Sequence, residues 1–258
     1  MELIGLIPAG GSAKRMGKLA CSKEIFPVGF DTDGYPKAIS EHLLEKYRAA
    51  ACKKVFFILR EGKWDIPSYY GDGQDLEMDF GYLMLRHLYG VPYTIDQAYP
   101  FVKDARIMLG FPDMIYEPAD VFAQLVDFHQ SSEADLVLGL YQVENEYEAS
   151  KSDMVAWDEQ TDQIIDIQIK PAKTERRFAW TNMVWGPNFT EFLHTFIKND
   201  LQQRLLDPSL PEIHLSEIML AAIKAGLNIK VKSFGQHSFL DVGTIPSMQK
   251  AWRRSFLS

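Results

Sequence analysis

Two glycines and two cations lie close together near the start of the chain, in the segment Pro8–Lys23. Gly10 and Gly11 follow an apolar stretch at once, and Arg15 and Lys23 come behind them. Glycine leaves the backbone amides bare, so that they can approach an anion closely, and it permits a positive φ. A glycine turn with accessible backbone amides and positive charge beside it is suited to the phosphates of a nucleoside triphosphate.

Two common phosphate-binding loops fit this segment poorly. In a Walker loop that begins at Gly11, Gly17 comes one position late and Leu19 stands where a hydroxyl would hold magnesium. A dinucleotide-binding fingerprint needs a helix directly after the glycines, whereas Pro27 and Gly29 fill the downstream segment. The sequence therefore favours a third kind of phosphate loop.

The composition is that of a globular enzyme. The 258 residues are 47% hydrophobic and 24% charged, which is enough for a sizeable α/β core. The formal net charge of −8 argues against broad binding to nucleic acid or to an anionic membrane. A polyanionic substrate must therefore be held in a local positive pocket.

The cysteines and the apolar runs indicate the compartment. Cys21 and Cys52 are the only cysteines, so one copy cannot form a disulfide framework or a cysteine-rich zinc site. The apolar stretch Leu3–Pro8 is too short for the core of a signal peptide, and no run approaches the roughly 18 apolar residues that span a bilayer. We expect reduced thiols and a cytoplasmic protein with neither a membrane nor a nucleic acid as partner.

Strand-like and helix-like stretches alternate through the first half, residues 1–143. This alternation predicts a doubly wound, mostly parallel Rossmann-like sheet with ligands at the carboxyl ends of its strands. Helices are expected at Ala38–Ala51, around Phe80–Leu88 and at Pro118–Ser131, and strands at Leu3–Ile7, Val55–Leu59, Pro92–Asp96, Arg106–Gly110 and Asp135–Val143.

The second half, residues 144–258, has a different pattern. Short apolar strands at Met154–Trp157, Ile164–Lys170 and Trp180–Trp185 are separated by turns and predict an antiparallel lobe. Later elements are expected as helices at Phe189–Lys198 and Leu215–Ala225, a strand at Ile229–Phe234 and a last helix through Arg254. Because no linker or internal repeat separates the halves, we predict a single domain over residues 1–258.

The motifs resemble those of the sugar-1-phosphate nucleotidyltransferases, the group that includes glucose-1-phosphate thymidylyltransferase. The resemblance begins with the glycine-rich segment and its Ser22-Lys23 and Pro27-Val28 pairs. It continues in the family's order through almost the whole chain, at Gly71-Asp72-Gly73, Gln97, Leu109-Gly110 with Asp113, Lys170-Pro171 and Phe239–Thr244. It implies a fold like that of the GT-A enzymes, with the first half binding nucleotide and the second half binding sugar.

The resemblance implies an activity without a protein nucleophile. An oxygen of a sugar 1-phosphate attacks the α-phosphorus of a nucleoside triphosphate, of which dTTP or UTP is favoured, and pyrophosphate leaves. Catalysis then consists of positioning and charge stabilisation. Arg15 would hold the triphosphate, Lys23 would lie between the phosphates of both substrates, and Lys170 would bind the sugar phosphate.

The resemblance also implies the nucleotide contacts and a metal. Asp113 and Asp241 would be the ligands of Mg²⁺, which prefers carboxylate and phosphate oxygens. The residues implied to bind the nucleotide are Ala9, Gly10, Gly11, Ser12, Gln97 and Gly110. The sequence leaves open whether the chain forms a homo-oligomer.

The chain departs from the family pattern at several positions. Ala13 replaces a usual glycine. In the family the metal-binding aspartate normally comes directly after the glycine that ends the strand, whereas here Phe111-Pro112 stand between that glycine and Asp113. Ile169 stands where a glutamate commonly binds sugar hydroxyls, and Tyr99–Asp104 replaces a stretch of small residues. These departures keep two alternatives open, a homologue that binds nucleotide or sugar phosphate without turnover, and a cytidylyltransferase for a non-sugar phosphate.

Each charged residue also has a purely structural alternative. Asp113 and Asp241 could cap helices, and Lys170 could be an exposed edge-strand lysine. The histidines His129, His194 and His214 lie on expected helices or caps, where a structural role is favoured.

Overall fold

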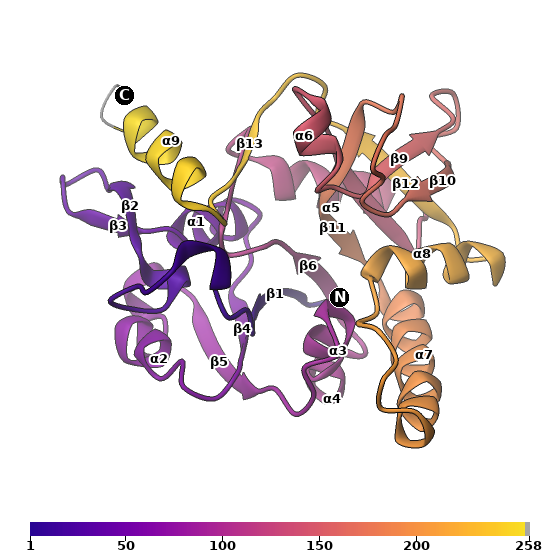
Figure 1. Ribbon diagram of the computed structural model, residues 1–258, viewed down its shortest axis with the longest axis horizontal. Helices are drawn as coiled ribbons and strands as arrows, with labels where there is room; N and C mark the ends of the chain where they lie inside the picture. Colours follow the sequence, from indigo (N-terminus) through magenta and orange to yellow (C-terminus); the bar gives the residue numbers. More distant parts are fainter. Residues whose placement is uncertain (256–258) are drawn as a thin grey trace.

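A mixed sheet of nine strands forms the centre of the molecule in the computed structural model, which describes residues 1–255 (Figure 1). Its strands are β1 (Leu3–Ala9), β4 (Lys54–Leu59), β5 (Asp79–Met84), β6 (Arg106–Leu109), β8 (Leu136–Gln142), β9 (Met154–Trp157), β10 (Ile164–Gln168), β11 (Phe178–Trp185) and β12 (Ile229–Ser233).

The strand order confirms the predicted α/β fold class with a parallel half and an antiparallel half. The main path runs β10-β9-β11-β6-β1-β4-β5, and β8 pairs with both β11 and β12. Strands β6, β1, β4 and β5 are mutually parallel, whereas β11 runs antiparallel to β6, β8 and β9. Because β11 belongs to both halves of the sheet, the core is not divided at residue 143.

Helices cover both faces of the sheet and bury two separate apolar layers. One layer includes residues of α3 (Val91–Asp96), α7 (Pro187–Leu206) and α8 (Leu215–Lys224). The other includes residues of α1 (Glu41–Ala49) and α5 (Val121–Ser131). The remaining helices are α2 (Asp65–Tyr70), α4 (Tyr99–Val102), α6 (Glu146–Ala149) and α9 (Ile245–Ser255).

The predictions for residues 80–103 were wrong about the type of element. The first part of the expected helix Phe80–Leu88 is instead strand β5, in which Gly81 passes Phe56 at a distance that a Cβ would not allow. The expected strand Pro92–Asp96 is helix α3, which begins after Gly90 (φ 111°) and carries proline in its first turn, where a missing N–H costs nothing. The expected loop beyond it contains α4.

Two small antiparallel sheets lie beside the main one. Strands β2 (Pro27–Phe30) and β3 (Pro36–Ala38) form a hairpin, and β7 (Met114–Tyr116) pairs with β13 (Phe239–Asp241). Helix α9 lies beside the hairpin (Figure 1), where the indole N–H of Trp252 donates to the carbonyl of Pro27 at 2.9 Å. The C-terminal elements thus return to the N-terminal half of the sheet.

None of the helices formed by residues 1–255 has both the length and the apolar character required to cross a membrane.

Candidate active site

Two adjoining cavities lie where β1 and β6 end. The first, here called the loop cavity, has a volume of about 430 Å³ and is lined by Gly10, Gly11 and Lys23 among others. The second, the lobe cavity, has a volume of about 390 Å³ and extends toward the antiparallel lobe. The residues that line both are Gly90, Val91, Phe111, Asp113 and Glu212. The shared wall makes the two cavities neighbouring compartments of one cleft.

The glycine-rich segment forms one wall of the loop cavity. A Cβ built on Gly11 would meet no atom within 4 Å, so the backbone there faces open space. The left-handed residues of the segment are instead Gly17 (φ 70°) and Ala13 (φ 50°). The absence of a side chain at Gly11 therefore leaves room for a ligand, while Ala13 adopts a conformation that costs a non-glycine residue on the order of 1 kcal/mol.

Lys23 is fixed in this wall by the residue before it. The amide and the hydroxyl of Ser22 both donate to the carboxylate of Asp65, at 2.6 and 2.7 Å. Lys23 begins a short 3₁₀ turn, and its Nζ lies 2.5 Å from Oδ2 of Asp113 across the cleft. Both side chains are largely shielded, with 14% and 17% of their surface exposed. The cation and the carboxylate therefore form a strong ion pair at the shared wall of the two cavities.

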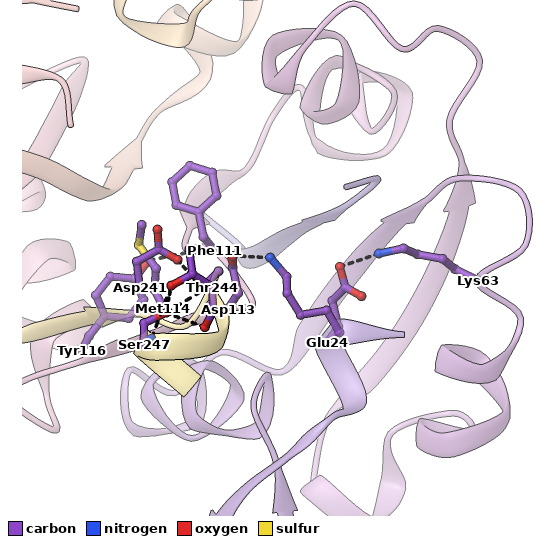
Figure 2. A network of polar contacts seen from close by, with 11 residues as sticks. Glu24, Lys63, Phe111, Asp113, Met114, Tyr116, Asp241, Thr244 and Ser247 are labelled. Carbon is purple, nitrogen blue, oxygen red and sulfur yellow. Dashed lines mark hydrogen bonds and ion pairs between the residues drawn. The ribbon is translucent and has the colours of Figure 1, made fainter. Parts of the chain in front are cut away.

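The pairing of β7 with β13 brings Asp113 next to Asp241, although Phe111-Pro112 displace it from the end of β6. Asp241 pairs with Met114, the neighbour of Asp113, and the amide of Val242 donates to the carbonyl of Asp113 at 2.8 Å. Figure 2 shows both carboxylates in one cluster. The inserted residues therefore do not remove Asp113 from the site.

Asp241 is held in an environment that disfavours its negative charge. Its Oδ1 accepts the amide of Gly243 at 2.7 Å. Burial, and after it the charge of Asp113, raise the pKa of Asp241, while the Gly243 amide and the positive charges of Lys23 and Arg15 act in the opposite direction. A buried carboxylate with a second carboxylate beside it provides a place where a cation is favoured.

Arg15 and Lys170 face the same compartment from opposite halves of the chain. Both line the lobe cavity together with Asp113 and Asp241. Lys170 follows β10 and has a left-handed backbone (φ 41°), and its side chain is exposed. Ile169, in contrast, does not line either cavity. The structure thus brings the predicted phosphate-binding cations and carboxylates to one cleft.

Three predicted nucleotide contacts lie outside the walls of both cavities. Ala9 is fully buried, and Gln97 forms the C-terminal cap of α3, whose residues Val91 and Thr94 line the loop cavity in its place. Gly110 donates its amide to the buried hydroxyl of Tyr47 at 2.7 Å, and a Cβ there would meet Leu43 at 2.4 Å. The lack of a side chain at Gly110 therefore serves packing between strand and helix.

Several residues that line the lobe cavity carried no motif in the sequence. Asp153 precedes β9, Trp180 and Thr181 belong to β11, and Glu212 lies in the loop before α8. Trp180 packs within the lobe, with 9% of its surface exposed, and also lines the cavity. The only sequence signal for Asp153 is a charged residue directly before an apolar strand.

A second ion pair lies at the wall of the loop cavity, which Glu24 lines. Nζ of Lys63 is 2.5 Å from Oε1 of Glu24, and the two side chains are 8% and 2% exposed (Figure 2). The other oxygen of Glu24 is buried and has no hydrogen-bond partner among the described residues. Glu24 follows Lys23 directly, so this pair anchors the turn that carries Lys23.

The described residues contain no cluster of three or more potential metal-ligating side chains. Asp113 and Asp241 are therefore a pair of carboxylates without a third protein ligand. This number suits Mg²⁺, which usually binds through one or two carboxylates and completes its octahedron with water and substrate phosphates. Residues 1–255 form no group of three or four such side chains of the kind that zinc normally needs.

Comparisons by sequence find no matching protein-family model and no match to a curated protein. Comparisons by structure find the same fold in several solved proteins. A UDP-glucose pyrophosphorylase in complex with UDP-glucose matches with a TM-score of 0.81 at 15% identity, over 100% of this chain and 99% of that chain.

Two further solved structures match over similar lengths. A protein of Bacillus anthracis assigned as a glucose-1-phosphate thymidylyltransferase, in complex with sucrose, has a TM-score of 0.80 at 20% identity, over 98% of this chain and 95% of that chain. The UTP-bound UGPase of Acinetobacter baumannii has a TM-score of 0.78 at 13% identity, over 98% and 93% of the respective chains. The chain therefore has the nucleotidyltransferase fold that the resemblance implied.

Proposed function

We propose that this chain, which has the fold of the sugar-1-phosphate nucleotidyltransferases, transfers a nucleotidyl group from a nucleoside triphosphate to a sugar 1-phosphate. The products are an NDP-sugar and pyrophosphate. By the same resemblance, dTTP and UTP are the favoured triphosphates.

The observation that carries the proposal is the convergence of charge on one cleft. Arg15 and Lys23 come from the glycine-rich segment, Lys170 from the antiparallel lobe, and Asp113 and Asp241 from the strand pair between them. These residues are far apart in the sequence. The cations among them gather in one place although the chain as a whole has a net charge of −8. Such an arrangement of cations and carboxylates around open space is suited to two phosphorylated substrates.

The positions of the residues suggest how they share the reaction. The loop cavity takes the triphosphate against the bare backbone of Gly11, and Lys23 stands between the two cavities. The lobe cavity takes the sugar phosphate, with Lys170 as its cation. A phosphate oxygen of the sugar phosphate attacks the α-phosphorus, the bond from that phosphorus to the bridging oxygen of the β-phosphate breaks, and the negative charge leaves with pyrophosphate. Lys23 from the loop cavity and Arg15 from the adjoining lobe cavity stabilise that charge. The sugar phosphate supplies the attacking oxygen, so no protein nucleophile is needed.

Asp113 and Asp241 would hold Mg²⁺. Burial, and after it the charge of Asp113, raise the pKa of Asp241, and a divalent cation at this pair would favour its ionised form. When bound, the ion would offset the negative charge of the phosphates. The ammonium group of Lys23 pairs with Asp113 and would turn to substrate phosphate when Mg²⁺ binds that carboxylate.

A protein that binds these ligands without turnover is the second candidate. The observation that favours it is Ile169, which places an apolar side chain where the resembling enzymes commonly have a glutamate for sugar hydroxyls.

One assay separates the two candidates. Pyrophosphate release is measured over a matrix of dTTP, UTP, CTP, ATP and GTP against hexose 1-phosphates and non-sugar phosphates, with Mg²⁺ and with EDTA. We expect release for at least one pair with a sugar 1-phosphate, and none with EDTA. Saturable nucleotide binding without release in every pair would instead establish the binding-only protein, and release with only a non-sugar phosphate would identify a cytidylyltransferase-like enzyme.

A further inference from the structure

The lobe cavity contains a carboxylate that the proposed chemistry does not use. Asp153 lines this cavity directly before β9, on the lobe side of the cleft. Its Oδ2 accepts a hydrogen bond from the hydroxyl of Ser216 at 2.6 Å. Its Oδ1 is buried and receives no hydrogen bond from any residue between 1 and 255. One half of the carboxylate is therefore held and the other half is unsatisfied.

The carboxylate is fixed in place by a short chain of hydrogen bonds. The indole N–H of Trp180 donates to Ser216 Oγ at 2.9 Å, and the Ser216 hydroxyl then donates to Asp153. Ser216 is fully buried in the first turn of α8, and Trp180 lies on β11. Three separate elements thus set the position of one carboxylate, an arrangement that a solvated surface aspartate does not need.

The unsatisfied oxygen needs a donor, because a buried acceptor without a partner costs on the order of 1–3 kcal/mol. An ionised carboxylate only accepts hydrogen bonds, so the ligand group that meets it must be a donor such as a hydroxyl. The neighbouring wall is aromatic: the rings of Phe111 and Trp180 lie 6.2 Å apart and both line the cavity. An apolar face beside a fixed acceptor is the combination that suits a sugar ring.

We propose that Asp153 is a specificity-determining residue, whose carboxylate accepts a hydrogen bond from a ring hydroxyl of the sugar phosphate in the lobe cavity. The proposal rests on the proposed function. It also accounts for Ile169: the hydroxyl acceptor lacking at that position is supplied from β9 instead of from the end of β10. Because Oδ1 is buried while Oδ2 accepts from Ser216, binding requires a small movement of the whole side chain that opens Oδ1 to the cavity.

The test compares Asp153→Asn with the wild-type enzyme and with Glu159→Gln, an exposed carboxylate in the turn after β9 that lies outside the cavity. The asparagine keeps its oxygen toward the Ser216 hydroxyl and presents an NH₂ donor in place of the acceptor. We expect the KM for the sugar 1-phosphate to rise about 10- to 100-fold, with the KM for the triphosphate unchanged. Glu159→Gln should leave both constants unchanged.

A substrate series identifies the hydroxyl. For the wild type, one monodeoxy sugar 1-phosphate should lose about as much in kcat/KM as Asp153→Asn loses with the parent sugar. For the variant, removing that same hydroxyl should lower kcat/KM little further, because the hydroxyl and the Asp153 carboxylate act as a pair. Ser216→Ala should weaken sugar binding to a smaller extent through its effect on Asp153, with thermal melting as the check on folding.

The outcomes separate this proposal from the proposed function. Pyrophosphate release with equal sugar KM in the wild type and Asp153→Asn overturns the role of Asp153 alone. If no substrate pair releases pyrophosphate, the transferase activity fails, and calorimetric binding of hexose 1-phosphates to the wild type and Asp153→Asn decides the role of Asp153. Equal binding, or no binding of any sugar phosphate to the folded wild type, overturns it.

Discussion

The ammonium group of Lys23 lies 2.5 Å from a carboxylate oxygen of Asp113, and these two residues are 90 positions apart in the chain. Each of them is implied to bind something other than its partner, Lys23 the substrate phosphates and Asp113 a magnesium ion. The ion pair holds the two charges in place across the cleft. Substrate and metal together would separate it without leaving either charge unpaired.

Substitutions at this pair distinguish a catalytic role from a structural one. Lys23→Met should lower turnover about 100- to 1000-fold, because a cation at the transferring phosphate is lost. Asp113→Asn should lower turnover comparably. If the pair served only the fold, the double variant Lys23→Met/Asp113→Asn would recover activity, since no unpaired charge remains. We expect the double variant to stay inactive, as measured by pyrophosphate release, with a cooperative melting transition.

Arg15→Ala and Asp241→Asn should each abolish measurable turnover while the protein remains folded. The stability consequence of Asp241→Asn is informative, because burial and the charge of Asp113 raise the pKa of Asp241. Replacing this strained carboxylate by a neutral amide should not lower the free energy of unfolding. Urea denaturation measures it, and wild-type rates in either variant would remove that residue from the site.

Gly11→Val tests whether the glycine-rich segment receives the triphosphate. Because a Cβ at Gly11 meets no protein atom within 4 Å, the valine should leave the melting temperature within a few degrees of the wild type. Its side chain would project into the loop cavity, so the KM for the triphosphate should rise at least tenfold. Gly73→Ala is the contrasting control: a Cβ there meets the carbonyl of Met78 at 2.7 Å, and the protein should lose stability.

Lys63→Met should destabilise the protein by about 3–5 kcal/mol, because it leaves the carboxylate of Glu24 buried without a counter-charge. Glu24 is only 2% exposed, so water replaces the lost partner poorly. The double variant Lys63→Met/Glu24→Leu, which removes both charges, should lose much less. Equal losses in the single and double variants, measured by chemical denaturation, would contradict this account of the buried pair.

His129 should make the protein less stable in mild acid. Its Nδ1 accepts the guanidinium N–H of Arg106 at 3.2 Å, and burial, followed by the charge of Arg106, lowers the pKa of His129 below 6.5. A group with a lowered folded-state pKa binds its proton more readily when unfolded. Its stabilising contribution is therefore complete above pH 6.5 and is lost as the pH falls through the folded-state pKa.

The comparison of two histidine variants isolates this contribution. In His129→Gln, an acceptor for Arg106 is kept and the titration is removed, so the free energy of unfolding should fall less between pH 7 and pH 5 than in the wild type. His237→Gln, at an exposed position, should follow the wild-type curve. Identical pH slopes for His129→Gln and the wild type would rule out His129 as the source.

The chain by itself determined the features that depend on neighbours along the sequence. The apolar runs that became β1, β4, β6 and β8 and the glycine turn after β1 were predicted, because a buried strand and a bare turn each need only a few consecutive residues. Where local preferences were balanced, as in residues 80–96, the prediction failed. Gly81 and Pro92 were compatible with either type of element, and packing against Phe56 and the helix position after Gly90 decided between them.

Only the tertiary structure decided what lies in the cleft. The insertion before Asp113 is compensated by the pairing of β7 with β13, a contact between segments more than 100 residues apart that no local pattern encodes. The same holds for Asp153, whose carboxylate is positioned by β11 and α8. Local sequence sets the backbone of a strand or turn, whereas the position of a side chain in a cleft is a property of every element that surrounds it. The glycine-rich segment could therefore be recognised from the sequence, and the carboxylates opposite it could be placed only by the fold.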